Sequence, residues 1–365
     1  MKHMLNLKVG RSESDLSGWS EGFDAYRVAP GHHPMFIHGD ALSVLRTFPD
    51  ESIDCSMTSP PYWGQRSYSG GGMGLETSYE EFVENLVEIC NQIHRVTKRT
   101  GSFWLNIGDA YLNKNLLGLP WRVAFALMDR QGWILRNSIV WNKVKGGLDN
   151  TKDKLRNVHE MVFHFVRDSK GYYYDMDAAR SKPGSSKVVG GAVVSATGVS
   201  GVRYRRQIEL STDLNDEEKR NAMAALDAVL LDVMEGRLSD FRMIIRAQQR
   251  TTHSDSDKVS GRAREIRERG FYFLKYHPNG SKLSDVWDIL PEDTQKRKGH
   301  FAAYPADLCK IPIMTTCPES GVVLDPFSGT GTTNYVAFRH GRKSIGIDVC
   351  GEYIKMASER CRLLL

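Results

Sequence analysis

The feature that most constrains the fold is an alternation of short apolar runs with helical patterns, which stops in the middle of the chain and later resumes. Runs rich in β-branched and aromatic residues predict strands at Met35–His38, Ile53–Thr58, Ser102–Ile107, Ile134–Trp141, Met161–Val166, Val322–Leu324 and Ser344–Ile347. Helical patterns separate many of these runs, among them Tyr79–Val96, Pro120–Met128 and Thr333–Arg339. Because strands that alternate with helices usually pair in parallel, we expect an α/β fold with a largely parallel sheet covered on both faces.

Residues 170–282 lack this alternation. The stretch Val188–Val202, rich in Val, Ala and Gly, is interpreted as a loop. A helix is predicted over about Asp216–Glu235, where Asn215 and Glu218 form a capping-box pattern, and a second one over Ser239–Gln249. We therefore expect an inserted domain at 170–282, between a first part of the sheet domain at 1–169 and a second part at 283–365.

The composition is that of an ordinary globular protein, with 41% hydrophobic and 25% charged residues, and it excludes a disordered chain, a collagen-like fibre or a small disulfide scaffold. The six cysteines form no C-x-x-C pair and have no histidines at zinc spacing, so we expect free thiols and no metal site. Neither an apolar signal segment nor a run of about 18 apolar residues is found, so we expect a cytoplasmic protein that does not span a membrane.

The first motif with chemical meaning is the segment D-P-F-S-G-T-G-T-T at Asp325–Thr333, which lies between a predicted strand and a predicted helix. A glycine turn at this place lets the backbone approach a ligand and directs helix N–H groups at it. The next strand ends in Asp348, and an acid there accepts hydrogen bonds from ribose hydroxyls in nucleotide-binding folds. The segment is neither G-x-G-x-x-G, since Asn334 replaces the third glycine, nor a phosphate loop, and the simplest alternative is a tight turn.

The second motif is T-S-P-P-Y-W at Thr58–Trp63, directly after the strand residues Ile53–Met57. Two prolines fix φ and remove two N–H donors, which predicts a rigid, extended loop with carbonyls free to accept hydrogen bonds from an amino group. Ser59 adds a hydroxyl, and Tyr62 and Trp63 add aromatic faces for a flat ring. The alternative is a Pro-Pro turn with buried aromatic residues.

Together, the S-P-P-Y and D-P-F-S-G-T-G-T-T segments resemble those of the DNA amino-methyltransferases, which use S-adenosylmethionine (SAM). A catalytic motif that precedes the cofactor loop resembles the circularly permuted β-group arrangement. The resemblance covers about Pro34–Arg167 and Ser284–Cys361, and 170–282 correspond in position to the family's target-recognition domain. It implies a Rossmann-like SAM-dependent methyltransferase sheet with an inserted, partly helical target-recognition domain.

The resemblance also implies site residues. Those implied for the cofactor are Asp40, Phe301, Pro305, Asp325, Pro326, Phe327, Ser328, Gly329, Gly331, Thr332 and Asp348. Those implied for a flipped base are Ser59, Pro60, Pro61, Tyr62 and Trp63. Asp348 would hold the ribose hydroxyls and Asp40 the adenine amino group of SAM, and Phe301 and Pro305 would flank its methionine end. The Pro60 carbonyl and Ser59 would accept the hydrogens of the target amino group while Tyr62 stacks on the base, with no covalent intermediate and no metal.

Serine at the first motif position resembles the cytosine-N4 members, and adenine N6 remains the alternative target. A catalytically idle DNA-binding regulator, an NAD-type dehydrogenase, and RNA or protein as the methyl acceptor stay open as further alternatives. The resemblance implies double-stranded DNA as the substrate. It leaves open whether the enzyme has a cognate restriction endonuclease as a functional partner or is a solitary modifier, and it leaves monomer and homodimer both open.

The positive charge gathers in one segment. Residues 242–282 contain ten Lys or Arg and four acids, a net charge of +6, whereas the whole chain has +5. Arg242, Arg246 and Arg250 recur at helical spacing, so we expect them on one helix face, and we expect Arg203–Arg206 in a loop. Arg and Gln read base edges and Arg and Lys contact phosphates, although a solvated basic face is the simpler alternative. The predicted DNA contacts are Arg242, Arg246, Gln249, Arg250, Arg262, Arg264 and Lys275.

Overall fold

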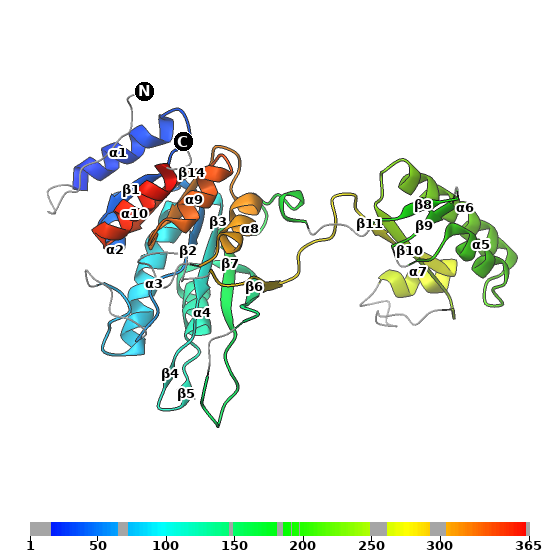
Figure 1. Ribbon diagram of the computed structural model, residues 1–365, viewed down its shortest axis with the longest axis horizontal. Helices are drawn as coiled ribbons and strands as arrows, with labels where there is room; N and C mark the ends of the chain where they lie inside the picture. The colour runs from blue at the N-terminus through cyan, green and yellow to red at the C-terminus, as the bar shows by residue number, and fades with distance from the viewer. Residues whose placement is uncertain are drawn as a thin grey trace. The chain divides into compact units, whose positions relative to one another are not determined.

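The computed structural model describes residues 16–64, 72–145, 149–180, 185–190, 192–196, 198–248, 261–292 and 304–362. The chain separates into two compact units, which are drawn in Figure 1. Unit 1 comprises Met1–Ala178 and Ser284–Leu365, and unit 2 comprises Ala179–Leu283. Unit 1 contains both sequence motifs, and unit 2 contains most of the segment that breaks the alternation.

Unit 1 is built on a sheet of eight strands within the described residues. Their spatial order is β1 (Met35–His38), β14 (Lys343–Asp348), β13 (Val322–Asp325), β2 (Ile53–Thr58), β3 (Thr97–Ile107), β7 (His159–Val166), β6 (Ile134–Asn142) and β12 (Val286–Asp288). All neighbours pair in parallel except β7, which runs antiparallel to both β3 and β6. The predicted largely parallel α/β sheet is therefore confirmed.

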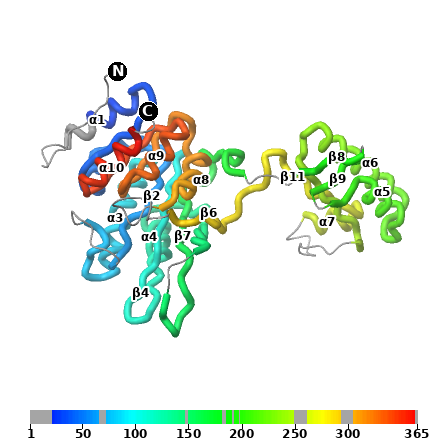
Figure 2. The backbone as a smooth tube through the Cα atoms, in the orientation of Figure 1, coloured from blue at the N-terminus to red at the C-terminus, as the bar shows by residue number. Residues whose placement is uncertain are grey.

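Strands from both ends of the chain lie side by side in this sheet, and Figure 2 shows the blue and red parts of the chain together in unit 1. His38 of β1 pairs with Asp348 of β14, and Leu324 of β13 pairs with Ser56 of β2. The carboxyl ends of these four parallel strands consequently lie along one edge of the sheet. In open α/β sheets, ligands bind at this carboxyl edge.

Helices cover both faces of the sheet. The helices of unit 1 are α1 (Leu16–Val28), α2 (Ala41–Leu45), α3 (Tyr79–Val96), α4 (Leu119–Gln131), α8 (Ala306–Thr316), α9 (Thr332–Arg339) and α10 (Gly351–Arg362). One apolar core contains side chains of α1 to α4, and a second core contains side chains of α8 and α9. A short hairpin of β4 (Tyr111–Leu112) and β5 (Asn115–Leu116) precedes α4.

The ends of α3 and α4 follow from local sequence. Ser78 caps α3 by accepting from the backbone N–H of Glu81, acids occupy its first turn, and Arg95 lies in its last turn, all of which suit the helix dipole. Pro120 lies in the first turn of α4, and Gly132 ends the helix in the left-handed conformation with φ of 76°. The predictions of helices at Tyr79–Val96 and Pro120–Met128 are confirmed.

Unit 2 has its own core. Its elements are β8 (Lys187–Val189), β9 (Ala192–Val194), α5 (Gly201–Glu209), α6 (Asp216–Met234), β10 (Asp240–Ile245), α7 (Gly261–Arg269) and β11 (Phe271–Tyr276). β8 pairs with β9 and β10 with β11, both antiparallel. The capping box of Asn215 and Glu218 is present at the start of α6, as predicted. That unit 2 is a target-recognition domain, and that the order of the sheet strands is a circular permutation, stay predictions.

Three sequence interpretations in this unit were wrong. The expected loop Val188–Val202 contains β8, β9 and the start of α5. The expected helix Ser239–Gln249 is the strand β10, because Phe241, Met243 and Ile245 alternate into the core and pair with β11. The expected loop at Arg203–Arg206 belongs to α5, since Ser200 caps this helix and Tyr204 and Ile208 anchor it in the core.

Candidate active site

The two sequence motifs meet at the carboxyl edge of the sheet. β2 and β13 are neighbours, so Ser59 and Pro60 follow one strand where the glycine loop follows the next. The Thr58 hydroxyl donates to Asp325 Oδ1 at 2.7 Å, which joins the two strand ends directly. Because residues 267 positions apart in sequence are joined here, the two motifs form one continuous site.

A buried polar cluster surrounds Tyr62. The Tyr62 hydroxyl donates to Glu160 Oε2 at 2.6 Å. Asn106 Nδ2 lies within hydrogen-bond distance of three oxygens, at 2.8 Å from Tyr62, 2.9 Å from Glu160 and 3.1 Å from Ser59. Lys143 donates to the other Glu160 oxygen. The S-P-P-Y loop is thus held by side chains from β3, from the start of β7, and from the residue after β6.

Burial, together with the adjacent Glu160 carboxylate, raises the pKa of the Tyr62 phenol well above its ordinary value. The phenol therefore stays protonated at neutral pH and acts as a hydrogen-bond donor to Glu160. A neutral aromatic ring with a fixed hydroxyl is a suitable surface on which a flat base can stack.

Two glycines make room for this loop. A Cβ at Gly108 would lie 2.7 Å from Tyr62 Cε2, so only glycine fits beside the ring. A Cβ at Gly74, whose φ is +96°, would lie 3.1 Å from the Tyr62 carbonyl oxygen. Trp63 donates its indole N–H to the Glu76 carbonyl at 3.1 Å and packs edge-on against Tyr79. These contacts make Trp63 a support of the loop.

Asp325 organises the glycine loop from inside. It is 1% exposed and accepts hydrogen bonds from Thr58, from Tyr304 at 2.9 Å, from Thr333 at 2.5 Å and from the Phe327 backbone N–H at 3.1 Å. Burial raises the pKa of this carboxyl group, whereas the four hydrogen bonds lower it. Since its oxygens are occupied, Asp325 fixes the shape of the loop.

The loop itself is tight. Gly329 and Gly331 have φ of 50° and 73°, which favour glycine. A Cβ at Gly331 would lie 2.8 Å from Ala357 Cβ of α10. The Ser328 backbone N–H donates to the Ile347 carbonyl at 2.9 Å, so the loop is fastened to β14.

Two further acids lie at the tips of neighbouring strands. Asp348, half-buried at the end of β14, accepts from the backbone N–H groups of Gly329 and Cys350, both at 2.8 Å. Burial raises the pKa of this carboxyl group. Asp40 lies two residues after β1, is exposed, and caps α2 by accepting from the Ser43 backbone N–H at 2.9 Å.

The remaining predicted cofactor residues differ in their surroundings. Pro326 is buried, and Phe327 is half-buried against the core. The Thr332 hydroxyl accepts from Arg360 at 2.9 Å, and Pro305 is the residue before α8. Phe301 lies outside the described residues.

These residues fit a nucleoside cofactor. Two carboxylates lie at adjacent strand tips, and a glycine loop precedes the N-terminus of α9. The buried hydroxyls of Ser328 and Thr330, in the same loop, have no hydrogen-bond partner within the described part of the chain. Such orphaned groups at a strand-to-helix turn are where a bound ligand can add hydrogen bonds.

Sequence reasoning missed several supporting residues, namely Asn106, Gly108, Lys143, Glu160 and Tyr304. Asn106 and Gly108 could have been found as a polar residue and a glycine at the end of a predicted strand. Glu160 gave a weaker signal, because its place at this edge depends on β7 running antiparallel. The direction of a strand is not readable from its residues.

The prediction that Arg242, Arg246 and Arg250 share one helix face was wrong, because Arg242 lies on the strand β10. Arg246 has internal partners: its guanidinium pairs with Glu218 at 2.7 Å and donates to the Asp213, Ile266 and Arg267 carbonyls. Arg262 stacks on Tyr272, Arg264 is exposed on α7, and Lys275 lies 3.9 Å from Asp232. Gln249 and Arg250 lie outside the described residues.

All six cysteines are buried free thiols. Within the described residues, no three metal-ligating side chains gather at one place. The same residues include no helix that is long and apolar enough to cross a membrane.

Comparison with known proteins places the chain in a family. A sequence profile described as DNA methylase, for N6 and N4 methyltransferases, matches residues 53–359. The type II methyltransferase M.SfiI of Streptomyces fimbriatus is 30% identical over 93% of each chain, and the DNA adenine methyltransferase YhdJ of Escherichia coli (strain K12) is 26% identical over 89% of this chain and 81% of its own. The PvuII DNA methyltransferase (cytosine-N4-specific) is similar in structure, with a TM-score of 0.54 and 17% identity over 90% of this chain and 86% of that one, which supports the fold. The chain therefore belongs to the DNA methylase family of N6 and N4 methyltransferases.

Proposed function

We propose that this DNA methylase transfers a methyl group from S-adenosylmethionine to the exocyclic N4 of a cytosine that is flipped out of duplex DNA. The observation that carries the proposal is the cluster of Ser59, Tyr62, Asn106 and Glu160 beside the glycine loop. A base amino group is a poor nucleophile, because its lone pair is delocalised into the ring. The chain must therefore hold that group in a geometry that frees the lone pair.

The cluster has the donors and acceptors for this task. Asn106 donates to one lone pair of Ser59 Oγ, which leaves the second lone pair to accept a hydrogen of the target amino group. The Pro60 carbonyl would accept the other hydrogen, since the S-P-P-Y backbone has few N–H groups of its own to satisfy it. Tyr62, fixed by Glu160 and Gly108, would stack on the base. Two acceptors on the amino hydrogens favour a pyramidal nitrogen whose lone pair points away from the ring plane.

When bound, S-adenosylmethionine supplies an electrophilic methyl group on a positively charged sulfur. Asp348 would hold the ribose hydroxyls and Asp40 the adenine amino group, because both lie at tips of neighbouring strands. Asp325 shapes the loop between them and the S-P-P-Y motif. Positioning of two reactants at fixed distance supplies most of the rate enhancement in such a transfer.

Ser59 at the first motif position resembles the cytosine-N4 members of the family, and this resemblance supports cytosine as the proposed base. Adenine N6 is the alternative product, because a relative named as a DNA adenine methyltransferase aligns over 89% of this chain. Relatives named as type II methyltransferases support double-stranded DNA as the substrate and a cognate restriction endonuclease as a functional partner.

Product analysis tests the proposal. Plasmid DNA is treated with the full chain and S-adenosylmethionine, digested to nucleosides, and examined by mass spectrometry. We expect N4-methylcytosine. N6-methyladenine without N4-methylcytosine would overturn the choice of base and keep the family activity.

A second test compares the roles of Ser59 and Tyr62. Ser59→Ala removes one acceptor and should lower kcat by roughly 10- to 100-fold, while Tyr62→Ala should lower it further because both stacking and the Glu160 contact are lost. Equal and complete loss of activity in both variants, with SAM binding retained, would argue against the proposed division of roles.

A further inference from the structure

Unit 2 carries the net positive charge of the chain. Residues 179–283 contain 19 Lys or Arg and 13 Asp or Glu, a net charge of +6, whereas all 365 residues have +5. A surface that neutralises phosphates needs cations that are exposed and uncommitted. The useful distinction in this unit is therefore between arginines with internal partners and arginines without them.

Helix α5 separates its residues by face. Tyr204 and Ile208 are buried in the core of unit 2, while Arg203 and Arg206 point to solvent. Arg205, on the flank between the faces, pairs with Asp227 of α6. Arg203 and Arg206 have no side-chain hydrogen bond or ion pair among the described residues, and they lie one helical turn apart.

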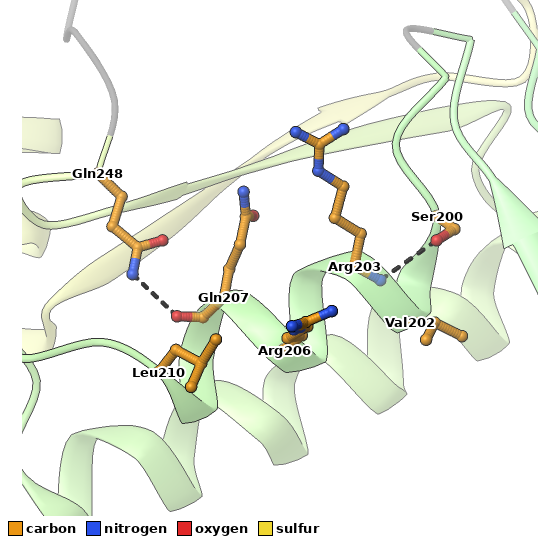
Figure 3. A pocket seen from close by; sticks show the side chains of 7 residues that line it. All are labelled: Ser200, Val202, Arg203, Arg206, Gln207, Leu210 and Gln248. Atoms are coloured by element: carbon orange, nitrogen blue, oxygen red, sulfur yellow. Dashed lines mark hydrogen bonds between the residues drawn. The ribbon is translucent and has the colours of Figure 1, made fainter.

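This outward face borders a groove with a volume of about 550 Å³, the α5 groove. Figure 3 shows Gln207 standing between Arg203 on one side and Gln248 on the other. Gln248 donates to the Gln207 backbone carbonyl at 2.8 Å, which ties the end of β10 to α5. Gln207 Oε1 is buried without a hydrogen-bond partner in the described part of the chain.

We propose that the α5 groove is the surface with which unit 2 contacts duplex DNA, an inference that rests on the proposed function. Arg203 and Arg206 neutralise phosphates, and the exposed Gln248, whose amide N–H group is held by the Gln207 carbonyl, offers its amide oxygen to a base edge. The exposed Val202 and Leu210 flank the arginines, and small apolar side chains suit thymine methyl groups.

The charge and the hydrogen-bonding groups of the α5 groove indicate duplex DNA as the molecule that binds there. Two uncommitted guanidinium groups at helical spacing and the exposed amide of Gln248 match a polyanion with hydrogen-bonding edges. Arg246, by contrast, is bound inside unit 2 by Glu218 and by backbone carbonyls. Arg203 and Arg206 thus place two exposed charges on α5, earlier in the sequence than the basic segment 242–282.

The test measures affinity of the full chain for a short fluorescent duplex of mixed sequence at salt concentrations between about 50 and 200 mM. The variant is Arg203→Ala with Arg206→Ala. The matched control is Lys187→Ala with Arg220→Ala, which removes two exposed charges of unit 2 that do not line the groove. SAM binding by calorimetry and the methylation of plasmid DNA are measured on the same samples.

We expect the groove variant to bind at least tenfold more weakly at low salt, and its plot of log affinity against log salt to be less steep by about two. The control should lose less than threefold in affinity, and SAM binding should be unchanged in both. Equal losses of affinity in variant and control, or no loss in the variant, would overturn the proposal that the α5 groove contacts DNA. Absence of methylation by the unaltered chain would instead overturn the proposed function.

Gln248→Ala sharpens the result, because it removes an amide from the groove and leaves both arginines. We expect the salt dependence to be retained and the set of methylated sites in plasmid DNA to broaden. An unchanged set of methylated sites would mean that Gln248 takes no part in base recognition.

Discussion

Polar side chains have hydrogen-bond partners at the carboxyl edge of the sheet in unit 1. On the outward face of α5 in unit 2, by contrast, two arginines have none among the described residues. At the sheet edge, Tyr62, Asn106 and Glu160 are hydrogen-bonded to one another and are buried or half-buried. On α5, Arg203 and Arg206 extend into solvent without a partner among the described residues. A site that transfers a methyl group needs a fixed geometry, whereas a surface that meets phosphates needs available charge.

The largest effect on this contrast is expected from a variant that displaces the Tyr62 ring at the sheet edge and removes no polar group. Gly108→Ala places a Cβ about where the Tyr62 ring lies, 2.7 Å from Cε2. Because a shift of about 1 Å at a reacting group costs on the order of 100-fold, we expect kcat to fall by about that factor. Gly171→Ala is the control, since the nearest atom to its Cβ is 3.8 Å away. Equal activities of the two variants would mean that the ring position does not matter.

The next largest effect distinguishes two arginines of unit 2. Arg246→Ala removes an ion pair to Glu218 and several hydrogen bonds to carbonyls, so unfolding free energy should fall by about 2 to 3 kcal/mol. Arg206→Ala should change stability by less than about 0.5 kcal/mol, since the side chain is exposed. Urea denaturation measures both. A larger loss for Arg206→Ala would reverse the assignment of structural and surface roles.

The next prediction concerns how the stability of unit 1 depends on pH. His164 is buried, stacks on Trp104 with centroids 4.1 Å apart, and burial lowers its pKa to about 3. In the unfolded chain a histidine titrates near pH 6.5, so between about pH 6.5 and 3 the unfolded state binds the extra proton. Stability should therefore fall as pH drops through this range, by up to about 1.4 kcal/mol per pH unit from this group.

The measurement is urea denaturation at neutral pH and near pH 5, with His164→Phe as the control because phenylalanine keeps a flat ring and cannot bind the proton. The control should lose roughly 2 kcal/mol less on acidification than the unaltered chain. The same slope in both proteins would show that other groups carry the acid sensitivity.

The smallest effect concerns the Tyr62 hydroxyl. Tyr62→Phe keeps the stacking ring but removes the contacts to Glu160 and Asn106, so we expect kcat to fall roughly five- to tenfold. Since the pKa of the phenol is raised well above its ordinary value, ionisation of Tyr62 should not limit the rate of the unaltered chain near neutral pH. A larger loss than for Tyr62→Ala is not compatible with the proposed stacking role.

The sheet strands and the two motifs could be predicted from sequence because strands and loops carry local signals. The run Ile53–Thr58 is apolar, two prolines follow it, and the structure has β2 with the same bounds. That Asn106 and Glu160 both contact Tyr62 could not be predicted, because β3 and β7 meet the S-P-P-Y loop only in space.

The prediction of a helix at Ser239–Gln249 failed for a different reason. Arginines at 242, 246 and 250 repeat every four residues, which is typical of a helix, yet Phe241, Met243 and Ile245 repeat every two. The two periods conflict over the same residues, and pairing with β11 resolves the conflict in favour of the strand. Charged residues on a surface are a weaker guide to local structure than the apolar residues that face the core.

The bond between Thr58 and Asp325 has a consequence for how the protein is made. It joins residues 267 positions apart, and β1 pairs with β14, close to the last described residues. A ribosome that has released the S-P-P-Y loop has not yet made the strands that complete the sheet around it. Unit 2, whose core uses residues of Ala179–Leu283, can fold earlier as a unit. We therefore expect a nascent chain to stay unable to modify DNA until β13 and β14 have been made.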